Sequence, residues 1–457
     1  MSLKARRILF ILFIIAFLII TPLVISYAVG YKISLSGKIL QKTGMLILDT
    51  EPEGAKIYLN GKPRQLFFKK YFKDEESYIT TPAKIKNLLP GKYDVKLELD
   101  GYYGWQKKLE IKPGMSTFAE DINLFKKNLP LLIRNGEIKQ ASLSPNGKYL
   151  AAVSDKEIDL IDLDNEKKIK LGALDAPEPS SDSRPVSWSP DNKKILFNGI
   201  VYNIDNLSKK LNLNNYIKNG IIKPKWRGKN EIIYLSGDKS DVKSFNLSDN
   251  TVKILIKDGK ILDFINKNDN IFIVTRLGKS ISLDVYKIGA PDKVRSIELP
   301  SFSDYEFINY KRDIINLYDK KHQILYLINP FSRFPLVETI NNVKRARWVG
   351  KNKLLYSNDF EIWLADFNPG YSGKKTLLTR ISNPINEIFW HPSENYVIYL
   401  TDNAIYAIEL DDRQKRNITK LVKLDRIAFP FLGKNGKKLY FYAKIGNQKG
   451  LYKLYIQ

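Results

Sequence analysis

Side chains that commonly perform catalysis or bind metals are scarce in this chain. Its 457 residues include no cysteine and only two histidines, His322 and His391. Without cysteine there can be no disulfide framework, thiolate zinc site, iron–sulfur cluster or cysteine nucleophile. Two histidines leave little material for a histidine metal site or a catalytic triad. We therefore predict no catalytic residues, no metal site and no cofactor.

Motifs of known hydrolases are missing or out of order. The sequence has no GxSxG elbow, no HExxH and no P-loop. The motifs of penicillin-binding enzymes do occur: SxxK at Ser236, Ser240 and Ser372, SDN at Ser248 to Asn250, and KTG at Lys42 to Gly44. The KTG triplet comes first and in a different segment, so we interpret these matches as chance.

An acidic run offers the best candidate for calcium binding. Asp159, Asp162 and Asp164 lie in DLIDLDN, but an EF-type loop needs Gly at its sixth place and Glu at its twelfth. Neither follows from Asp162. Similar hairpins recur as NIDNLSKK, NLSDNTVK and ELDDRQKR, which favours a repeated turn.

Both histidines are also predicted to lie in turns. His391 occupies the position that Ser144 and Ser189 hold in related segments, and His322 lies in the charged stretch DKKHQIL. Neither position indicates a catalytic role.

The N-terminus predicts a membrane anchor. Ile8 to Val29 contain no charged residue, and such a helix is roughly 33 Å long, enough to cross a bilayer core of about 30 Å. Lys4, Arg6 and Arg7 precede it, which favours a cytoplasmic N-terminus. A cleaved signal peptide, with small residues at Ser26-Tyr27-Ala28, is the alternative. Both interpretations place the rest of the chain outside the cytoplasm.

The remaining sequence alternates in the manner of β-strands, so we predict an all-β protein behind the helix. MLILD, AKIYLN, YDVKLEL and KKLEIK are separated by turn sequences such as NGK and LLPGK, which indicates a small antiparallel sandwich. We divide the chain into four parts: anchor 1–30, linker 31–43, sandwich 44–127 and a repeat region 128–457.

The sandwich segment resembles a PEGA domain. The motifs that carry the resemblance are Pro52-Glu53-Gly54-Ala55, Asn60-Gly61-Lys62, Thr81-Pro82, Leu89-Pro90-Gly91-Lys92-Tyr93 and Gly101-Tyr102. The resemblance implies a surface-associated bacterial or archaeal protein in which these residues are structural and not catalytic. The glycines fall where turns need a permissive backbone.

One insertion departs from that family pattern. Between Lys62 and Thr81 lie 18 residues that interleave aromatic and basic side chains, with a candidate interface at Phe67, Phe68, Lys69, Lys70, Tyr71 and Phe72. Such segments favour contacts with headgroups or partner proteins. The alternative, which we favour, is that the aromatic residues fill the joint between the sandwich and the repeat region.

The repeat region predicts a β-propeller. An aromatic or apolar residue followed by a turn recurs every 38 to 45 residues, at Leu143, Trp188, Trp226, Phe264, Phe307, Trp348, Trp390 and Phe431. This period has room for four short strands, as in a propeller blade. We predict eight blades, or seven if the units at Phe264 and Phe307 merge, with LPLLIRN before the first unit closing the ring. The turns resemble those of TolB-type and WD-repeat propellers, a fold that hosts many unrelated functions.

The net charge of +25 is spread along the chain. The densest cluster runs from Val343 to Trp348, and in a strand Lys344 would face one side while Arg345 and Arg347 face the other. Nucleic-acid sites concentrate charge beside stacking aromatics, so we do not predict a nucleic-acid partner.

Together these features predict a non-enzymatic, single-pass membrane protein of the cell envelope. The sandwich would act as a spacer, and the propeller would bind an envelope protein or another ligand. Two alternatives remain open: electrostatic binding of an anionic wall polymer, and a propeller-type hydrolase or lyase.

Overall fold

The computed structural model shows an all-β protein preceded by one long helix. It describes residues 3–32, 41–65, 78–155, 157–173, 186–290, 292–301, 303–308, 314–368 and 373–457. The helix α1 spans Leu3–Ala28, contains Pro22, and is long and apolar enough to cross a membrane. Its apolar side chains are exposed along its length, as expected of a helix that no other part of the chain covers. The short strands β1 (Tyr31–Lys32) and β2 (Gln41–Lys42) follow it.

A sandwich of two sheets comes next. One sheet has the order β6-β3-β9 and the other β5-β4-β7-β8. The strands are β3 (Gly44–Glu51), β4 (Lys56–Leu59), β5 (Lys62–Pro63), β6 (Ala83–Leu88), β7 (Gly91–Glu98), β8 (Trp105–Ile111) and β9 (Ser116–Asn123). The prediction of a purely antiparallel sandwich is wrong, because β3 and β9 pair in parallel. Alternate residues of β3 and β8 fill the core between the sheets.

The described residues of the rest of the chain form eight four-stranded antiparallel sheets. In blades 1 to 4 the strands are β11 (Gln140–Leu143), β12 (Tyr149–Val153), β13 (Glu157–Asp162), β14 (Lys167–Ala173); β15 (Ser187–Trp188), β16 (Lys194–Phe197), β17 (Ile200–Asn203), β18 (Lys210–Asn212); β19 (Ile221–Arg227), β20 (Glu231–Ser236), β21 (Asp241–Asn246), β22 (Thr251–Lys257); β23 (Lys260–Lys267), β24 (Asn270–Leu277), β25 (Ser280–Lys287) and β26 (Lys293–Leu299). A 3₁₀ turn, Leu213–Asn215, follows blade 2.

The second half of the ring repeats the same plan. In blades 5 to 8 the strands are β27 (Tyr305–Phe307), β28 (Ile315–Asp319), β29 (Ile324–Ile328), β30 (Leu336–Ile340); β31 (Arg345–Val349), β32 (Lys353–Ser357), β33 (Glu361–Asp366), β34 (Lys374–Arg380); β35 (Glu387–Trp390), β36 (Tyr396–Leu400), β37 (Ala404–Glu409), β38 (Ile418–Lys423); β39 (Ile427–Leu432), β40 (Lys438–Ile445), β41 (Gln448–Tyr455) and, as outer strand, β10 (Leu131–Asn135). Phe264 and Phe307 belong to separate blades, so eight is correct and seven is not.

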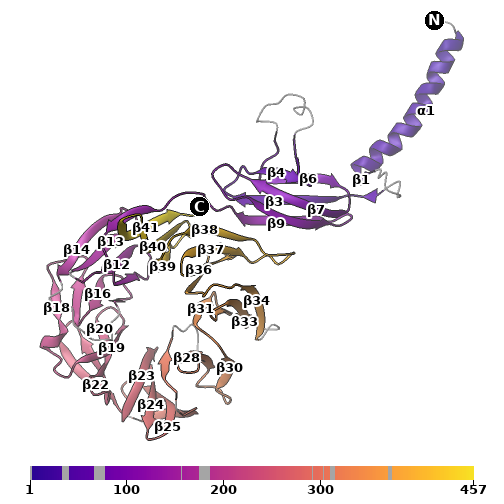
Figure 1. Ribbon diagram of the computed structural model, residues 1–457. Helices are drawn as coiled ribbons and strands as arrows, with labels where there is room; N and C mark the ends of the chain where they lie inside the picture. The colour runs from indigo at the N-terminus through magenta and orange to yellow at the C-terminus, as the bar shows by residue number, and fades with distance from the viewer. Residues whose placement is uncertain are drawn as a thin grey trace.

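The ring is closed by both ends of the repeat region. Strand β10, from the predicted LPLLIRN segment, pairs with β41 and completes blade 8. Eight apolar clusters join the blades in pairs, and one of them joins blade 8 to blade 1 through Tyr440, Leu451 and Leu150. The first strands of neighbouring blades contact one another, so they line the centre of the ring. Figure 1 shows the sheets following one another around this ring, with the sandwich between the ring and α1.

The aromatic residues that start the repeats pack between blades. Trp188 and Phe264, for example, lie in the clusters that join their own blade to the preceding one. Blade 8 differs, because a register shift in β39 turns Phe431 toward blade 1 and leaves Leu432 against blade 7. In the last blade, therefore, the position equivalent to the other repeat starts is held by Leu432, one residue after the predicted Phe431.

Candidate functional site

One end of the ring carries the turns between the first and second and between the third and fourth strands of each blade; we call it the turn face. The opposite end, with the remaining connections, is the loop face. On the turn face the ends of the four strands bring one residue each into a rim row. In blade 7 this row is His391, Tyr396, Glu409 and Asn417, and in blade 3 it is Arg227, Glu231, Asn246 and Thr251.

The sandwich docks on the rim row of blade 7 through a buried ion-pair network. The ammonium of Lys107, on β8, lies 3.0 Å from Glu409 Oε2 and 3.2 Å from Asp411 Oδ2, and the Lys107 side chain is 1% exposed. The indole Nε1 of Trp105 donates to Glu409 Oε1 at 3.0 Å. Separation of a buried pair leaves an uncompensated charge, so this network resists opening of the joint.

Apolar and backbone contacts extend the joint. Phe125, just after β9, packs edge-on against Tyr396 with ring centres 5.2 Å apart and lies in the cluster between blades 7 and 8. The backbone N–H of Asn123 donates to the Tyr396 hydroxyl at 3.2 Å, and that of Lys126 donates to the Ile456 carbonyl at 2.9 Å. Burial raises the pKa of Tyr396, so its hydroxyl stays protonated. Sandwich and propeller are thus packed into one body.

Asp411 supplies a negative charge at the edge of the joint between the sandwich and blade 7. Burial acts to raise its pKa, but hydrogen bonds from Arg413 and the charge of Lys107 outweigh that effect and lower the pKa to about 2. Arg413 also donates to the Phe118 carbonyl of the sandwich. The Asp411 carboxylate is therefore charged at any pH well above its pKa of about 2.

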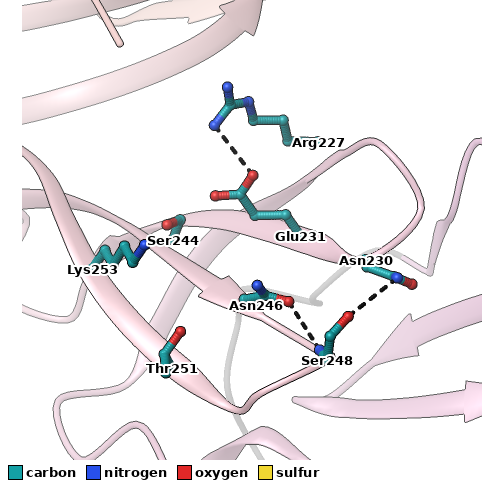
Figure 2. Close-up of a pocket in the computed structure, with 8 residues that line it drawn as sticks. All are labelled: Arg227, Asn230, Glu231, Ser244, Asn246, Ser248, Thr251 and Lys253. Atoms are coloured by element: carbon teal, nitrogen blue, oxygen red, sulfur yellow. Dashed lines mark hydrogen bonds and ion pairs between the residues drawn. The ribbon is translucent and has the colours of Figure 1, made fainter. Parts of the chain in front are cut away.

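The rim row of blade 3 lines an open polar pocket of about 370 Å³. Figure 2 shows Arg227 paired to Glu231, at 3.2 Å, and the Asn246 and Asn230 side chains bonded to Ser248. Glu231 is the single carboxylate in this lining, and Arg227 neutralises it. The pocket can hold a polar ligand, but it lacks the second carboxylate that paired acid–base chemistry needs.

The residue after each repeat-start aromatic explains why the pocket forms at blade 3. Ser144, Ser189, Val349 and His391 hold this position elsewhere and are buried. Blade 3 has Arg227 instead, with its side chain 32% exposed. The charged Arg227 side chain stays partly exposed at the wall of the pocket, which is open on this side of the blade.

Among the residues that the structure describes, neither histidine is arranged with its neighbours as in a serine triad. Ser303 Oγ and Asp319 Oδ2 lie 3.3 and 2.6 Å from His322, but both contact the same nitrogen, Nδ1. A serine triad needs the serine on the other ring nitrogen. His391 is buried between the Ser393 hydroxyl and the Gly436 carbonyl, and burial lowers its pKa.

Carboxylates on the inner strands each face a cation. In the described part of the ring these are Asp263 with Lys223 at 3.3 Å, Glu306 with Lys320 at 2.8 Å, and Glu387 with Arg347 at 3.1 Å. Asp263 and Glu306 lie on neighbouring blades, and the ammonium groups of Lys225 and Lys320 interact electrostatically with both carboxylates. Glu387 lies on blade 7, so the described inner strands present two carboxylates that share cations and one ion pair elsewhere.

The basic cluster of blade 6 divides as the sequence predicted. Arg345 and Arg347 reach the Asn386 carbonyl and Glu387 on the next blade, whereas Lys344 binds Asp359 within its own blade. These cations are used in structural contacts around the ring.

The acidic run of blade 1 is also structural. Asp159 pairs with Arg134 of the closing strand at 2.7 Å, and both side chains are buried. Asp162 accepts the backbone N–H groups of Asp164 and Asn165, which fixes the predicted turn. No cluster of three metal-ligating side chains occurs among the described residues.

The family-motif residues lie in the sandwich turns. Pro52, Glu53, Gly54 and Ala55 form the β3–β4 turn, Gly61 the β4–β5 turn, Thr81 and Pro82 precede β6, Gly91 begins β7, and Gly101 and Tyr102 lie in the β7–β8 turn. The structure brings two of these motifs together, because Gly54 and Ala55 donate backbone N–H groups to the Thr81 carbonyl and hydroxyl at 2.8 and 3.0 Å. The candidate interface at Phe67, Phe68, Lys69, Lys70, Tyr71 and Phe72 lies outside the described residues.

Sequence reasoning missed the residues that make the joint. A signal was present in WQKKLEI, where strict alternation puts Lys107 on the same buried side as Trp105 and Leu109. A lysine on the apolar side of a strand indicates a buried anionic partner. Nothing local to β8 indicates that this partner is Glu409.

Comparisons with known proteins agree with the fold and add no family. No family model and no curated protein matches the chain. Among solved structures, the Dos1 propeller matches with a TM-score of 0.50 and 14% identity over 72% of this chain and 94% of that chain. A eukaryotic initiation factor matches at 0.47 and 12%, over 72% and 93%. Dipeptidyl peptidase 4 of Porphyromonas gingivalis matches at 0.48 and 12%, over 69% and 57%.

Proposed function

We propose that this protein is a membrane-anchored platform of the cell envelope, which binds a partner protein through its propeller and catalyses no reaction. The observation that carries the proposal is the buried network of Lys107, Glu409 and Asp411. It fixes the propeller on the sandwich by one edge of the turn face. A platform that presents a surface at a set orientation needs such a joint, whereas an independent soluble propeller does not.

The anchor and its direction support this location. Helix α1 has the length and composition of a membrane span, and Arg6 and Arg7 at its start favour a cytoplasmic N-terminus. The sandwich, with its resemblance to PEGA domains, then lies outside as a spacer between the span and the propeller. A cleaved signal peptide would give the same compartment without the tether.

The loop face is the surface that we assign to the partner, since the sandwich occupies part of the opposite face. It exposes apolar side chains from separate blades: Tyr216 of the connection after blade 2, Leu277 at the end of β24, and Phe360 before β33. Exposed aromatic and aliphatic side chains on a rigid frame are typical of protein-binding surfaces.

Site-specific photo-crosslinking in intact cells tests the proposal. A photoreactive residue at Leu277 or Phe360 is expected to yield one discrete protein adduct, while the same residue at Ile254, exposed on the outer strand β22, yields none. Protease added outside the cells should remove a C-terminal tag and leave an N-terminal tag intact. Adducts at all three positions alike, or a protected C-terminal tag, would contradict the proposal.

A further inference from the structure

A second cleft, of about 430 Å³, lies where the sandwich meets blade 7. Strands β7 and β8 supply Asp94, Gln106, Lys107 and Lys108, and the turn between β37 and β38 supplies Lys415 and Arg416 on the other side. The cleft exists because the two modules are docked, since neither lines it alone.

The cations of this cleft exceed its anions. Four basic side chains line the cleft, and its lining contains one carboxylate, that of Asp94. Gln106 Nε2 donates to both oxygens of this carboxylate, to Oδ2 at 2.8 Å and to Oδ1 at 3.0 Å. Lys107 is consumed by the buried network of the joint. Lys108 lies across the β7–β8 ladder from Asp94, and neither Lys108 nor Lys415 has an ion pair within the described ranges, so the lining keeps an excess of positive charge.

Arg416 is held in the cleft wall with unused hydrogen-bonding capacity. Its side chain is 15% exposed and forms a long ion pair with the exposed Asp412, whose Oδ2 lies 3.7 Å from Nη2. Its Nε is buried and has no hydrogen-bond partner in the described structure. The buried Nε is closed to a ligand in the cleft, so an acceptor would bind through the Nη groups of this guanidinium.

We propose that this cleft binds an oxyanion, a phosphate or carboxylate group carried on an extended anionic polymer. The planar guanidinium of Arg416 suits two parallel hydrogen bonds to such a group, and Lys108 and Lys415 add charge from opposite walls. The cleft is open to solvent, so a group carried on a longer chain can enter it. The bound anion would also reduce repulsion between the basic groups of the two modules and tighten the joint.

Calorimetric titration of the full chain in a neutral detergent tests this proposal. The probes are sodium polyphosphate, poly-L-glutamate of similar chain length, and inorganic phosphate. The triple variant Lys108→Gln, Lys415→Gln and Arg416→Gln removes three charges from the cleft. The matched control Lys260→Gln, Lys279→Gln and Lys287→Gln removes three charges from exposed positions on blade 4.

The cleft triple is expected to weaken binding of the preferred polymer at least about tenfold, and the control less than about twofold. Polymer that binds more tightly than inorganic phosphate supports the extended ligand, and a preference for phosphate or carboxylate identifies the source of the oxyanion. Equal losses in both triples, or no saturable binding, would overturn the proposal, because the effect would then be one of net charge.

Two further variants keep the test decisive. If the cleft triple fails to fold, Lys108→Gln with Lys415→Gln leaves Arg416 in place and should still weaken binding severalfold. Arg416→Lys retains the charge but loses the planar fork, so it should weaken binding while the control lysines do not. Crosslinking through Leu277 should be unchanged in the cleft variants, which lie away from the loop face, and this separates failure of this proposal from failure of the platform function.

Discussion

Blades 3 and 7 lie on opposite sides of the eight-bladed ring and present equivalent rim rows, yet the sandwich covers the row of blade 7 and leaves the row of blade 3 open. In blade 7 Glu409 is covered by the sandwich and bound to Lys107 and Trp105. In blade 3 Glu231 remains at the edge of an open pocket and pairs with Arg227 of its own blade. Glu409 ends the third strand of its blade and Glu231 begins the second strand of its own, so it is the row, and not one repeat position, that supports a buried joint in one blade and a solvated surface in the other. Burial, rather than residue type, decides how strongly each ion pair contributes.

The largest effect should come from removing the buried cation of the joint. Lys107→Met leaves Glu409 and Asp411 without their counter-ion and should lower the free energy of unfolding by about 3–5 kcal/mol. Urea unfolding of the full chain in detergent measures this change. Lys253→Met, beside the blade 3 row, is the control and should stay within about 0.5 kcal/mol. Equal effects would abolish the contrast between the two rows.

Removing one hydrogen bond from the same carboxylate should have a smaller effect. Trp105→Phe keeps an aromatic ring, though a smaller one, and loses the N–H that binds Glu409, at a cost of about 1.5–3 kcal/mol for a bond to a charged group. Trp226→Phe is the matched control, because its indole donates to a neutral carbonyl, that of Ser187, at 3.3 Å. Hydrogen exchange at the Asn123 and Lys126 amides should accelerate in the first variant and not in the second.

Lowering the pH should have the third-largest effect, because it weakens the joint between the sandwich and blade 7. The pKa of Asp411 is about 2 in the folded chain and ordinarily 3.8, so its charged form stabilises the fold. That contribution, about 1–2 kcal/mol after allowance for partial exposure, is complete above the ordinary value and is lost as pH falls toward 2. Asp411→Asn should flatten the dependence of unfolding on pH in this window. An unchanged slope would show that the carboxylate is not held by the joint.

The smallest effect is expected in the blade 3 row. Glu231→Gln breaks a partly exposed ion pair with Arg227 and should change the free energy of unfolding by no more than about 0.5 kcal/mol. The same urea measurement applies. A loss above about 2 kcal/mol would mean that this row is as structural as that of blade 7.

Much of the architecture could be predicted because its signals are local. Each blade repeats its strands and turns within about 40 residues, so the aromatic starts at Trp188, Trp348 and Trp390 mark blades without reference to distant parts of the chain. The closing strand at Leu131–Asn135 followed from counting strands, since the last unit lacked one. In β39, where the register shifts before Phe431, the predicted repeat start was wrong by one residue.

Features that depend on pairing between distant strands could not be predicted in this way. The parallel pairing of β3 with β9 leaves no mark on either strand, because alternation is the same in both directions. Arg134 and Asp159 look like ordinary surface charges until the ring closes and buries them against each other.

The sequence by itself determined the apolar helix, the strand-rich character, the blade count and the scarcity of catalytic side chains. Only the tertiary structure decided which blade receives the sandwich, which rim row stays open, and where the uncompensated cations gather. The physical reason is distance along the chain: Lys107 and Asp411 are 304 residues apart, and a buried ion pair acquires its strength only when folding removes both partners from water.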